Sequence, residues 1–164
     1  MNEEFIKEQL SEWMVNFIEK PNSLLGNWAP CPYARQARIA NKIEVQFTEV
    51  SNMFETINQQ LSKLEHKDVI IICFDHNRIS PEFLQEFVVS TNTLLMKNDY
   101  VILEDHPNTP EYVNGVKMNF GHCGLLLLQK LSKLTEASDL LKEKGYYDVW
   151  SKHNLNDVVD WRNK

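Results

Sequence analysis

The uninterrupted apolar run Val69 to Phe74, read VIIICF, constrains the fold of this chain most strongly. An apolar run of this length, rich in β-branched residues, predicts a strand that is buried on both faces. Such a strand lies inside a sheet that is covered by helices on its two sides. Two further stretches have strand character: Ile43 to Val50, where apolar and polar residues alternate, and the run that begins at Tyr100. The chain is therefore expected to build a sheet with helices packed on it.

The predicted elements alternate along the chain. A helix over residues 1–20 comes first and a short helix from Cys31 to about Ala40 second. Strands then alternate with helices up to the strand at Tyr100, which a long loop joins to a fourth strand, and a closing helix ends at Gly145. This order predicts an α/β fold: a single-domain sandwich with a four-stranded mixed sheet, ferredoxin-like or thioredoxin-like, plus an extra N-terminal helix. We expect one domain over residues 1–164, with an amphipathic helix at 1–20 and an aromatic C-terminal tail at 146–164. The order of the strands in the sheet stays open.

Charge and composition exclude several classes of protein. The net charge of -6 removes the main electrostatic reason to bind phosphate backbones, so we expect no nucleic-acid partner. The longest apolar runs are far shorter than the roughly 20 residues of a membrane span, and the N-terminus MNEEFIKEQL lacks the apolar core of a signal peptide. The three cysteines form no CxxC pair. We therefore expect a cytoplasmic protein with reduced thiols and no membrane partner.

Unusual polar residues stand at the ends of two apolar runs. The run Val101 to Leu103 ends in Glu104, Asp105 and His106, and the run Leu125 to Leu128 is preceded by His122 and Cys123. If the two runs are neighbouring strands, these side chains lie near one rim of the sheet, where open α/β sheets commonly bind their ligands. The alternative is structural: Glu104 and Asp105 as solvated loop residues, and Cys123 as a small core residue.

Cys31 is the second candidate. It stands between two prolines, where we expect it to cap the short helix that follows, and the positive end of that helix would lower the pKa of its thiol. Four residues on this segment and on the long loop after His106 are candidates for binding a ligand: Trp28, Tyr33, Arg35 and Tyr112.

Three functional interpretations use these residues. In the first, Cys31, His106 and His122 bind zinc or iron, with Glu104, Asp105, Cys123 or water completing the coordination. In the second, Cys31 is a metal-free nucleophile, with His106 or His122 as its base and Glu104 or Asp105 orienting that base. In the third, the protein is a non-catalytic binding or interaction module.

Two resemblances bear on this choice. The segment CPYARQA resembles the CPYCxxA helix opening of glutaredoxins, but Ala34 replaces the second cysteine and no strand directly precedes Cys31, so we do not adopt it. From about Cys31 to Gln129 the chain resembles a small bacterial family of uncharacterised function with CPFA, His-Pro and His-Leu-Leu motifs. Here the matching residues are Cys31 to Ala34, His106-Pro107, and His122 ahead of Leu125-Leu126. This resemblance implies no reaction, but it indicates the same cysteine and two histidines.

The leading hypothesis is a small-molecule enzyme with a metal site built from Cys31, His106 and His122. Its catalytic residues would be Cys31, Glu104, Asp105 and His106. The apolar stripe of the N-terminal helix and the aromatic tail could each bury themselves on a second copy of the chain, so a homodimer is a further candidate assembly.

Overall fold

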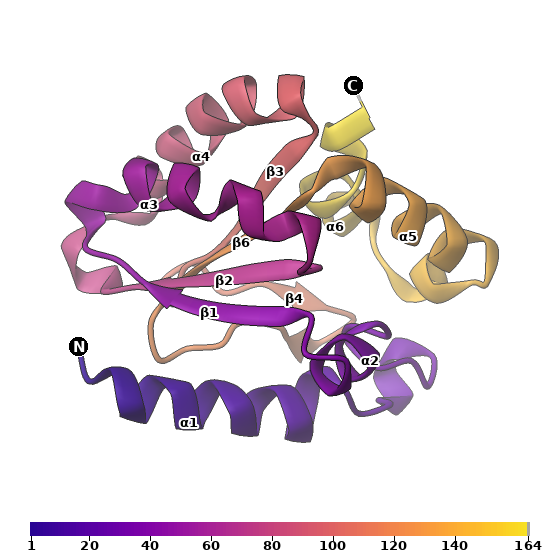
Figure 1. Cartoon of the computed structure of the whole chain (residues 1–164). Helices are drawn as coiled ribbons and strands as arrows, with labels where there is room; N and C mark the ends of the chain where they lie inside the picture. The colour runs from indigo at the N-terminus through magenta and orange to yellow at the C-terminus, as the bar shows by residue number, and fades with distance from the viewer. Residues whose placement is uncertain (164) are drawn as a thin grey trace.

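A four-stranded sheet forms the centre of the molecule (Figure 1). The computed structural model describes residues 1–163. The strand order is β1-β2-β6-β3, with β1 parallel to β2, and β6 antiparallel to both β2 and β3. The predicted α/β fold with a four-stranded mixed sheet is confirmed, and the last residue of the predicted tail, Lys164, lies outside the described residues. The strands are β1 Ile43–Phe47, β2 Val69–Phe74, β3 Tyr100–Asp105 and β6 Gly124–Lys130.

The strand β2 is buried on both faces, as its apolar run predicts. It lies between β1 and β6, and its residues from Ile70 to Phe74 are all buried. Ile70, Ile72 and Phe74 contribute to one core and Ile71 and Cys73 to another, because successive side chains of a strand point to opposite faces. The two strands with mixed composition, β1 and β3, take the edges of the sheet.

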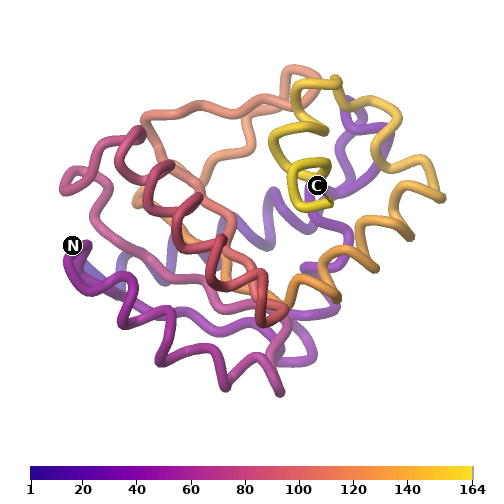
Figure 2. The backbone as a smooth tube through the Cα atoms, turned by 90° about the horizontal axis from the view of Figure 1, so that it is seen from above, coloured from indigo at the N-terminus to yellow at the C-terminus, as the bar shows by residue number. Residues whose placement is uncertain are grey.

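Two helices cover one face of the sheet, α3 (Met53–Gln60) and α4 (Pro81–Leu95), and they lie side by side over it (Figure 2). Ser80 caps α4, since its hydroxyl accepts a hydrogen bond from the amide of Phe83 at 3.3 Å. Buried residues of both helices, among them Ile57 and Leu84, complete the core on this face.

The opposite face is covered by α1 (Glu3–Trp13), which continues as a π-helical turn over Met14–Ile18. The predicted N-terminal helix is confirmed, and Asn2 caps it by accepting from the amide of Phe5 at 3.1 Å. Three residues of its apolar stripe are buried against Ile71, Cys73 and Leu125 of the sheet: Ile6, Leu10 and Met14.

The chain between β3 and β6 forms a small hairpin of β4 (Tyr112–Val113) and β5 (Val116–Lys117). The predicted tight turn at Asn114-Gly115 is confirmed: both residues have positive φ, 47° and 82°, as a two-residue hairpin loop requires. The hairpin packs on Leu25 rather than on the main sheet.

Short helices fill the remaining connections and the C-terminus. Gly145 ends α5 with φ 84°, as predicted. No helix of the described chain is long and apolar enough to cross a membrane. The other helices are α2 Ala34–Ile39, α5 Leu131–Glu143 and α6 Lys152–Val158, with 3-10 turns at Ser23–Leu25, Val50–Asn52, Leu61–Glu65, His76–Arg78, Met96–Asn98, Tyr146–Val149 and Asp160–Asn163.

Candidate functional site

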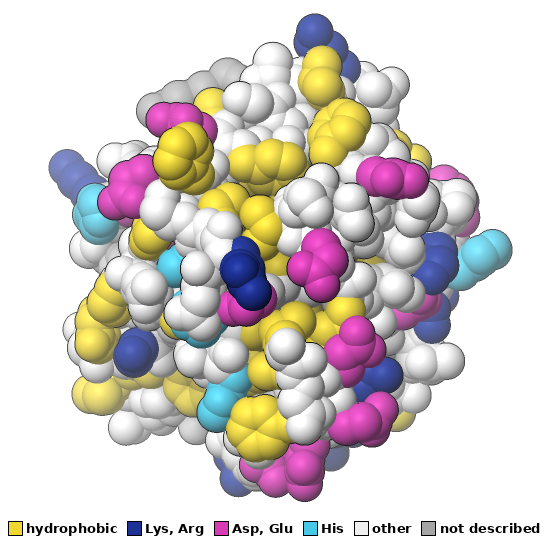
Figure 3. All heavy atoms as spheres, turned by 90° about the vertical axis from the view of Figure 1, so that its left-hand side faces the viewer, with side chains coloured by type: hydrophobic (Ala, Val, Ile, Leu, Met, Phe, Trp, Pro, Cys, Tyr) yellow, Lys and Arg dark blue, Asp and Glu magenta, His cyan; other side chains and the backbone are white. Residues whose placement is uncertain are grey.

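The ends of three strands and the start of a fourth meet at one rim of the sheet. Because β6 is antiparallel to both of its neighbours, β1, β2 and β3 run in one direction and end beside the start of β6. We call this edge the carboxyl rim; it comprises residues 75–76, 104–106 and 122–123. Figure 3 views the molecule from this end, and histidine and acidic side chains reach the surface there. The predicted meeting of the two polar clusters is confirmed, since Asp105 lies opposite Leu125.

Asp105 anchors the loop that follows β3. Its two carboxyl oxygens accept hydrogen bonds from the amide of Phe120 at 2.8 Å and from Nδ2 of Asn119 at 2.6 Å. Burial raises the pKa of Asp105, and these two donors oppose that shift without cancelling it. Both oxygens are thus occupied by groups of the protein, which indicates a structural role for this side chain.

Asn119 is a residue of the site that sequence reasoning missed. It is buried, with 9% of its surface exposed, and it joins three parts of the loop. Besides its bond to Asp105, its Nδ2 donates to the carbonyl of Thr109 at 3.2 Å, and its Oδ1 accepts from the amide of Glu111 at 2.7 Å. No local pattern marks this asparagine, because its partners are 8 to 14 residues away in the chain.

His106 uses both of its ring nitrogens inside the protein. It is 4% exposed; Nδ1 accepts from the amide of Asn108 at 3.1 Å, and Nε2 lies 3.0 Å from the carbonyl oxygen of Ile79. Since Nδ1 is an acceptor and the carbonyl can only accept, the arrangement requires the neutral tautomer with its proton on Nε2. The imidazole therefore links the end of β3 to the segment before α4. No lone pair is left for a metal ion or a substrate proton.

Glu104 has the most unusual environment of the rim. It shares a strand face with Ile102, toward α4, and among the described residues its Oε2 is buried without a hydrogen-bond partner. Burial, followed by the negative charge of Glu111, raises the pKa of Glu104 to about 7. Burial, followed by the charges of Asp105 and Asp157, raises the pKa of Glu111 to about 6. Two neighbouring carboxyl groups thus titrate close to neutral pH.

His122 and Cys123 lie on the α1 side of the rim and are not joined to Glu104. The ring of His122 is exposed and packs against Phe5 and Phe120, with ring centroids 5.7 and 5.2 Å apart. The thiol of Cys123 is buried beside that of Cys73, and this contact, together with burial, raises the pKa of Cys123. Cys123 is therefore a small core residue, as the structural interpretation of the sequence predicts.

Cys31 precedes α2, and α2 leads into the start of β1, at the end of the sheet opposite to the carboxyl rim (Figure 1). Its amide donates to the carbonyl of Ile18 at 3.0 Å, and α2 begins only at Ala34, so the predicted helix start at Cys31 was wrong. Although the residue as a whole is exposed, desolvation raises the pKa of its thiol, and the amides of Tyr33 and Ala34 oppose this without reversing it. The expected lowering of the pKa was therefore wrong as well.

Three of the four predicted binding residues lie on the segments around Cys31, and the fourth lies on the hairpin. Trp28 packs against Tyr146 of the C-terminal segment, with ring centroids 5.8 Å apart. The hydroxyl of Tyr33 donates to the carbonyl of Ala137 at 3.5 Å, and Arg35 is exposed on α2. The side chain of Tyr112 is exposed on the hairpin. The structure thus divides the predicted site into a rim part and a Cys31 part.

The arrangement does not fit a metal ion held jointly by Cys31, His106 and His122. Within residues 1–163 no three His, Cys, Asp or Glu side chains are grouped so that they could hold a metal. We expect elemental analysis of protein purified without a metal-binding tag to find well below one equivalent of zinc or iron, with no change in Cys31→Ala. Near one equivalent in the wild type, lost in Cys31→Ala and His106→Ala, would restore the metal site and show that the loops rearrange around it.

Comparison with models of protein families, with curated proteins and with solved structures returned no match for this chain. The resemblance to a small bacterial family stays a prediction.

Proposed function

We propose that this protein is a small-molecule enzyme in which Glu104 is the general acid and base, with Glu111 as its neighbouring carboxylate. One observation carries the proposal: the partly buried carboxyl group of Glu104 has a pKa of about 7 and an oxygen that finds no hydrogen-bond partner within residues 1–163. A general acid or base works best when its pKa lies near the working pH, because both protonation states are then available. Burial of a polar atom without a partner destabilises the fold, and a role in proton transfer would account for its presence at this position.

The pairing of the two carboxyl groups supports the same reaction class. When Glu111 is ionised, its charge disfavours ionisation of Glu104, so the proton is held at Glu104. A substrate that takes up this proton, or delivers one, would interact with a carboxyl group that gains or loses its proton with little cost in free energy near neutral pH. In this proposal Asp105, His106 and Asn119 act indirectly, since they hold the loop that carries Glu111.

Titration of the glutamate side chains by carboxyl ¹³C NMR tests the premise. We expect one resonance to titrate near pH 7, far above the ordinary value of 4.5, and to vanish in Glu104→Gln. The matched control is Glu136→Gln, which removes an exposed carboxylate on α5 and should leave that resonance in place. A spectrum in which every glutamate titrates between about 4 and 5 would remove the basis for the proposed role.

The raised pKa also predicts how stability changes with pH. Between about 4.5 and 7 the folded protein keeps the Glu104 proton while the unfolded chain has lost it, so this group lowers the free energy of unfolding as pH rises through that window. Glu104→Gln should therefore match the wild type near pH 4 and exceed it at pH 8. A shift of this size corresponds to about 3 kcal/mol, reduced to about 1–2 kcal/mol by partial exposure. Urea denaturation across this pH range measures it.

Ligand screening then tests the function itself. Small molecules are screened by thermal shift at pH 6 and pH 8 against the wild type, Glu104→Gln and Glu136→Gln. Binders at the proposed site should lose their pH dependence in Glu104→Gln alone, because the protonation change is removed there. If the pH dependence of binding changes equally in Glu104→Gln and Glu136→Gln, the small-molecule site lies elsewhere in the protein.

A further inference from the structure

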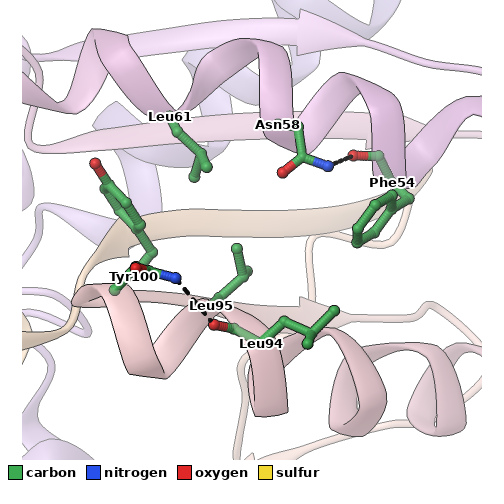
Figure 4. Close-up of a pocket in the computed structure, with 7 residues that line it drawn as sticks. Phe54, Asn58, Leu61, Leu94, Leu95 and Tyr100 are labelled. Atoms are coloured by element: carbon green, nitrogen blue, oxygen red, sulfur yellow. Dashed lines mark hydrogen bonds between the residues drawn. The ribbon is translucent and has the colours of Figure 1, made fainter.

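The helices α3 and α4 form the two walls of an open groove on the outer surface of the molecule. They lie side by side on the same face of the sheet (Figures 1 and 2). A pocket of about 490 Å³ opens between them, and Figure 4 shows its side chains reaching toward one another from both helices. Its lining residues are Phe54, Asn58, Leu61, Leu94, Leu95, Asn98 and Tyr100.

An apolar stripe runs along each wall. On α3 and its extension, Phe54 and Leu61 are about two turns apart; on α4, Phe83, Phe87 and Leu94 recur at intervals that place them on one flank. These side chains are far from fully covered, because Phe54 is 48%, Leu94 53% and Phe83 68% exposed. Exposed apolar side chains on both walls of a pocket, as Phe54 and Leu94 are, are typical of an interaction site.

The charged residues of α3 and α4 themselves are all acidic, whereas the 3-10 turns that follow these helices contain Lys63 and Lys97. The segments MFETINQQ of α3 and PEFLQEFVVSTNTLL of α4 contain no lysine or arginine. Their charged residues are Glu55, Glu82 and Glu86, all in the N-terminal half of their helices. The groove is therefore acidic at the end where α3 and α4 begin, and it complements a basic partner.

Two asparagine side chains of the groove are held by hydrogen bonds to their own helices. The side-chain amide of Asn58 donates to the carbonyl of Phe54 at 3.0 Å, and that of Asn98 donates to the carbonyl of Leu94 at 3.5 Å. Within residues 1–163 neither amide oxygen accepts a hydrogen bond, and in Figure 4 the oxygen of Asn58 points toward the space between the helices. Oxygens in these positions accept hydrogen bonds from Lys or Arg side chains of a bound segment.

We propose that the α3–α4 groove binds an amphipathic helix of a partner protein, with an apolar face and with Lys or Arg at the end that lies over Glu82 and Glu86. A helix fits because the groove is bounded by two helices, and its apolar side chains would insert between the two stripes as ridges into grooves. The basic end follows from the acidic residues near the start of both helices, since Lys63 and Lys97 lie beyond their C-terminal ends. This proposal is independent of the reaction proposed for Glu104, which lies at the carboxyl rim.

A synthetic peptide tests it directly. The probe is an amphipathic helix of about 18 residues, about five turns, with leucines on one face and lysines on the other; a second peptide replaces lysine by glutamate. Fluorescence anisotropy should show that the lysine peptide binds the wild type and the glutamate peptide does not. Phe54→Ser and Leu94→Ser should each weaken binding by about tenfold, as expected for central apolar contacts. The matched control Leu140→Ser changes an exposed leucine of α5 and should bind like the wild type.

Charge variants distinguish binding in the groove from general electrostatic attraction of a basic peptide to an acidic protein. Glu82→Lys/Glu86→Lys should weaken binding of the lysine peptide by about tenfold, whereas Glu8→Lys/Glu12→Lys, the same change on α1, should have a far smaller effect. Equal effects of the two double substitutions on peptide affinity, or an affinity that Leu94→Ser leaves unchanged, would overturn the proposal. No binding at about 1 mM peptide would overturn it too. Self-association of the wild type that Leu94→Ser abolishes would instead assign the groove to a second copy of the chain.

Discussion

Replacing Gly124 by alanine is expected to lower the free energy of unfolding by about 3 kcal/mol, the upper end of the usual cost of overpacking. A Cβ at this position would lie 2.2 Å from Cε2 and from Cζ of Phe74. Phe74 is fully buried, and it pairs with Gly124 across β2 and β6, so neither the ring nor the backbone has free space to move into. Urea denaturation of the wild type and the variant measures the difference.

The second variant needed is Phe74→Leu, because a smaller side chain removes the ring atoms that the new Cβ would meet. The backbone of Gly124 does not lie in the positive-φ region, so alanine brings no conformational strain of its own. In a double-mutant cycle, Gly124→Ala should therefore cost much less in the Phe74→Leu background than in the wild type. Equal costs in the two backgrounds would mean that the contact with the ring is not the cause.

Asp105→Ala is expected to lower the free energy of unfolding by about 2–4 kcal/mol, because one backbone amide loses its acceptor and a buried side-chain amide loses the shortest of its hydrogen bonds. These groups are the amide of Phe120 and Nδ2 of Asn119, bound at 2.8 and 2.6 Å. The loss should also release the loop before β6, so hydrogen exchange at the amide of Phe120 should become faster than at Ile102 in the centre of β3. Denaturation and hydrogen exchange monitored by NMR are the measurements.

Asp105→Asn is the matched control for this prediction. One oxygen remains to accept from the amide of Phe120, but the new NH₂ group would face the NH₂ group of Asn119. Asn119 cannot simply turn over, because its own oxygen accepts from the amide of Glu111. We therefore expect an intermediate loss of stability. If Asp105→Ala changes stability by less than about 0.5 kcal/mol, the loop is held by other contacts and the structural role given to Asp105 is wrong.

The carboxyl rim could be predicted from the sequence because the patterns that indicate it involve residues close together in the chain. The run Val69–Phe74 marks the central strand, and the apolar runs after Tyr100 and Gly124 mark the next two. Polar residues that end one strand and precede an antiparallel neighbour have to meet at the same rim. His106, Asp105 and His122 were therefore placed correctly at this edge, although the order of the strands was unknown.

The chemistry of those residues could not be predicted in the same way. His106 looks like a free ligand in the sequence, but its partners Ile79 and Asn108 belong to two different loops. Glu111 gives no signal at all until the loop folds back and brings it near Glu104. Burial and hydrogen bonding set the protonation of such groups, and both depend on contacts between distant segments.

Cys31 is a second residue whose environment could not be predicted from the sequence. Its neighbouring prolines correctly indicate a turn before a helix, yet α2 starts three residues later, at Ala34, and burial rather than the helix sets the direction of the pKa shift. Sequence spacing says nothing about where a loop comes to lie relative to a sheet. The segment with the cysteine leads through α2 into the start of β1, whereas the two histidines lie where β3 ends and β6 begins.

The sequence by itself determined the elements of this protein: the buried central strand, the amphipathic helices with their caps at Asn2 and Ser80, and the tight turn at Asn114-Gly115. Periodicity and turn chemistry are properties of neighbouring residues, so they can be read along the chain. Only the tertiary structure decided which polar groups are satisfied and which are left unpartnered, such as Oε2 of Glu104. That outcome depends on desolvation and on partners brought from elsewhere in the chain, and no local pattern encodes it.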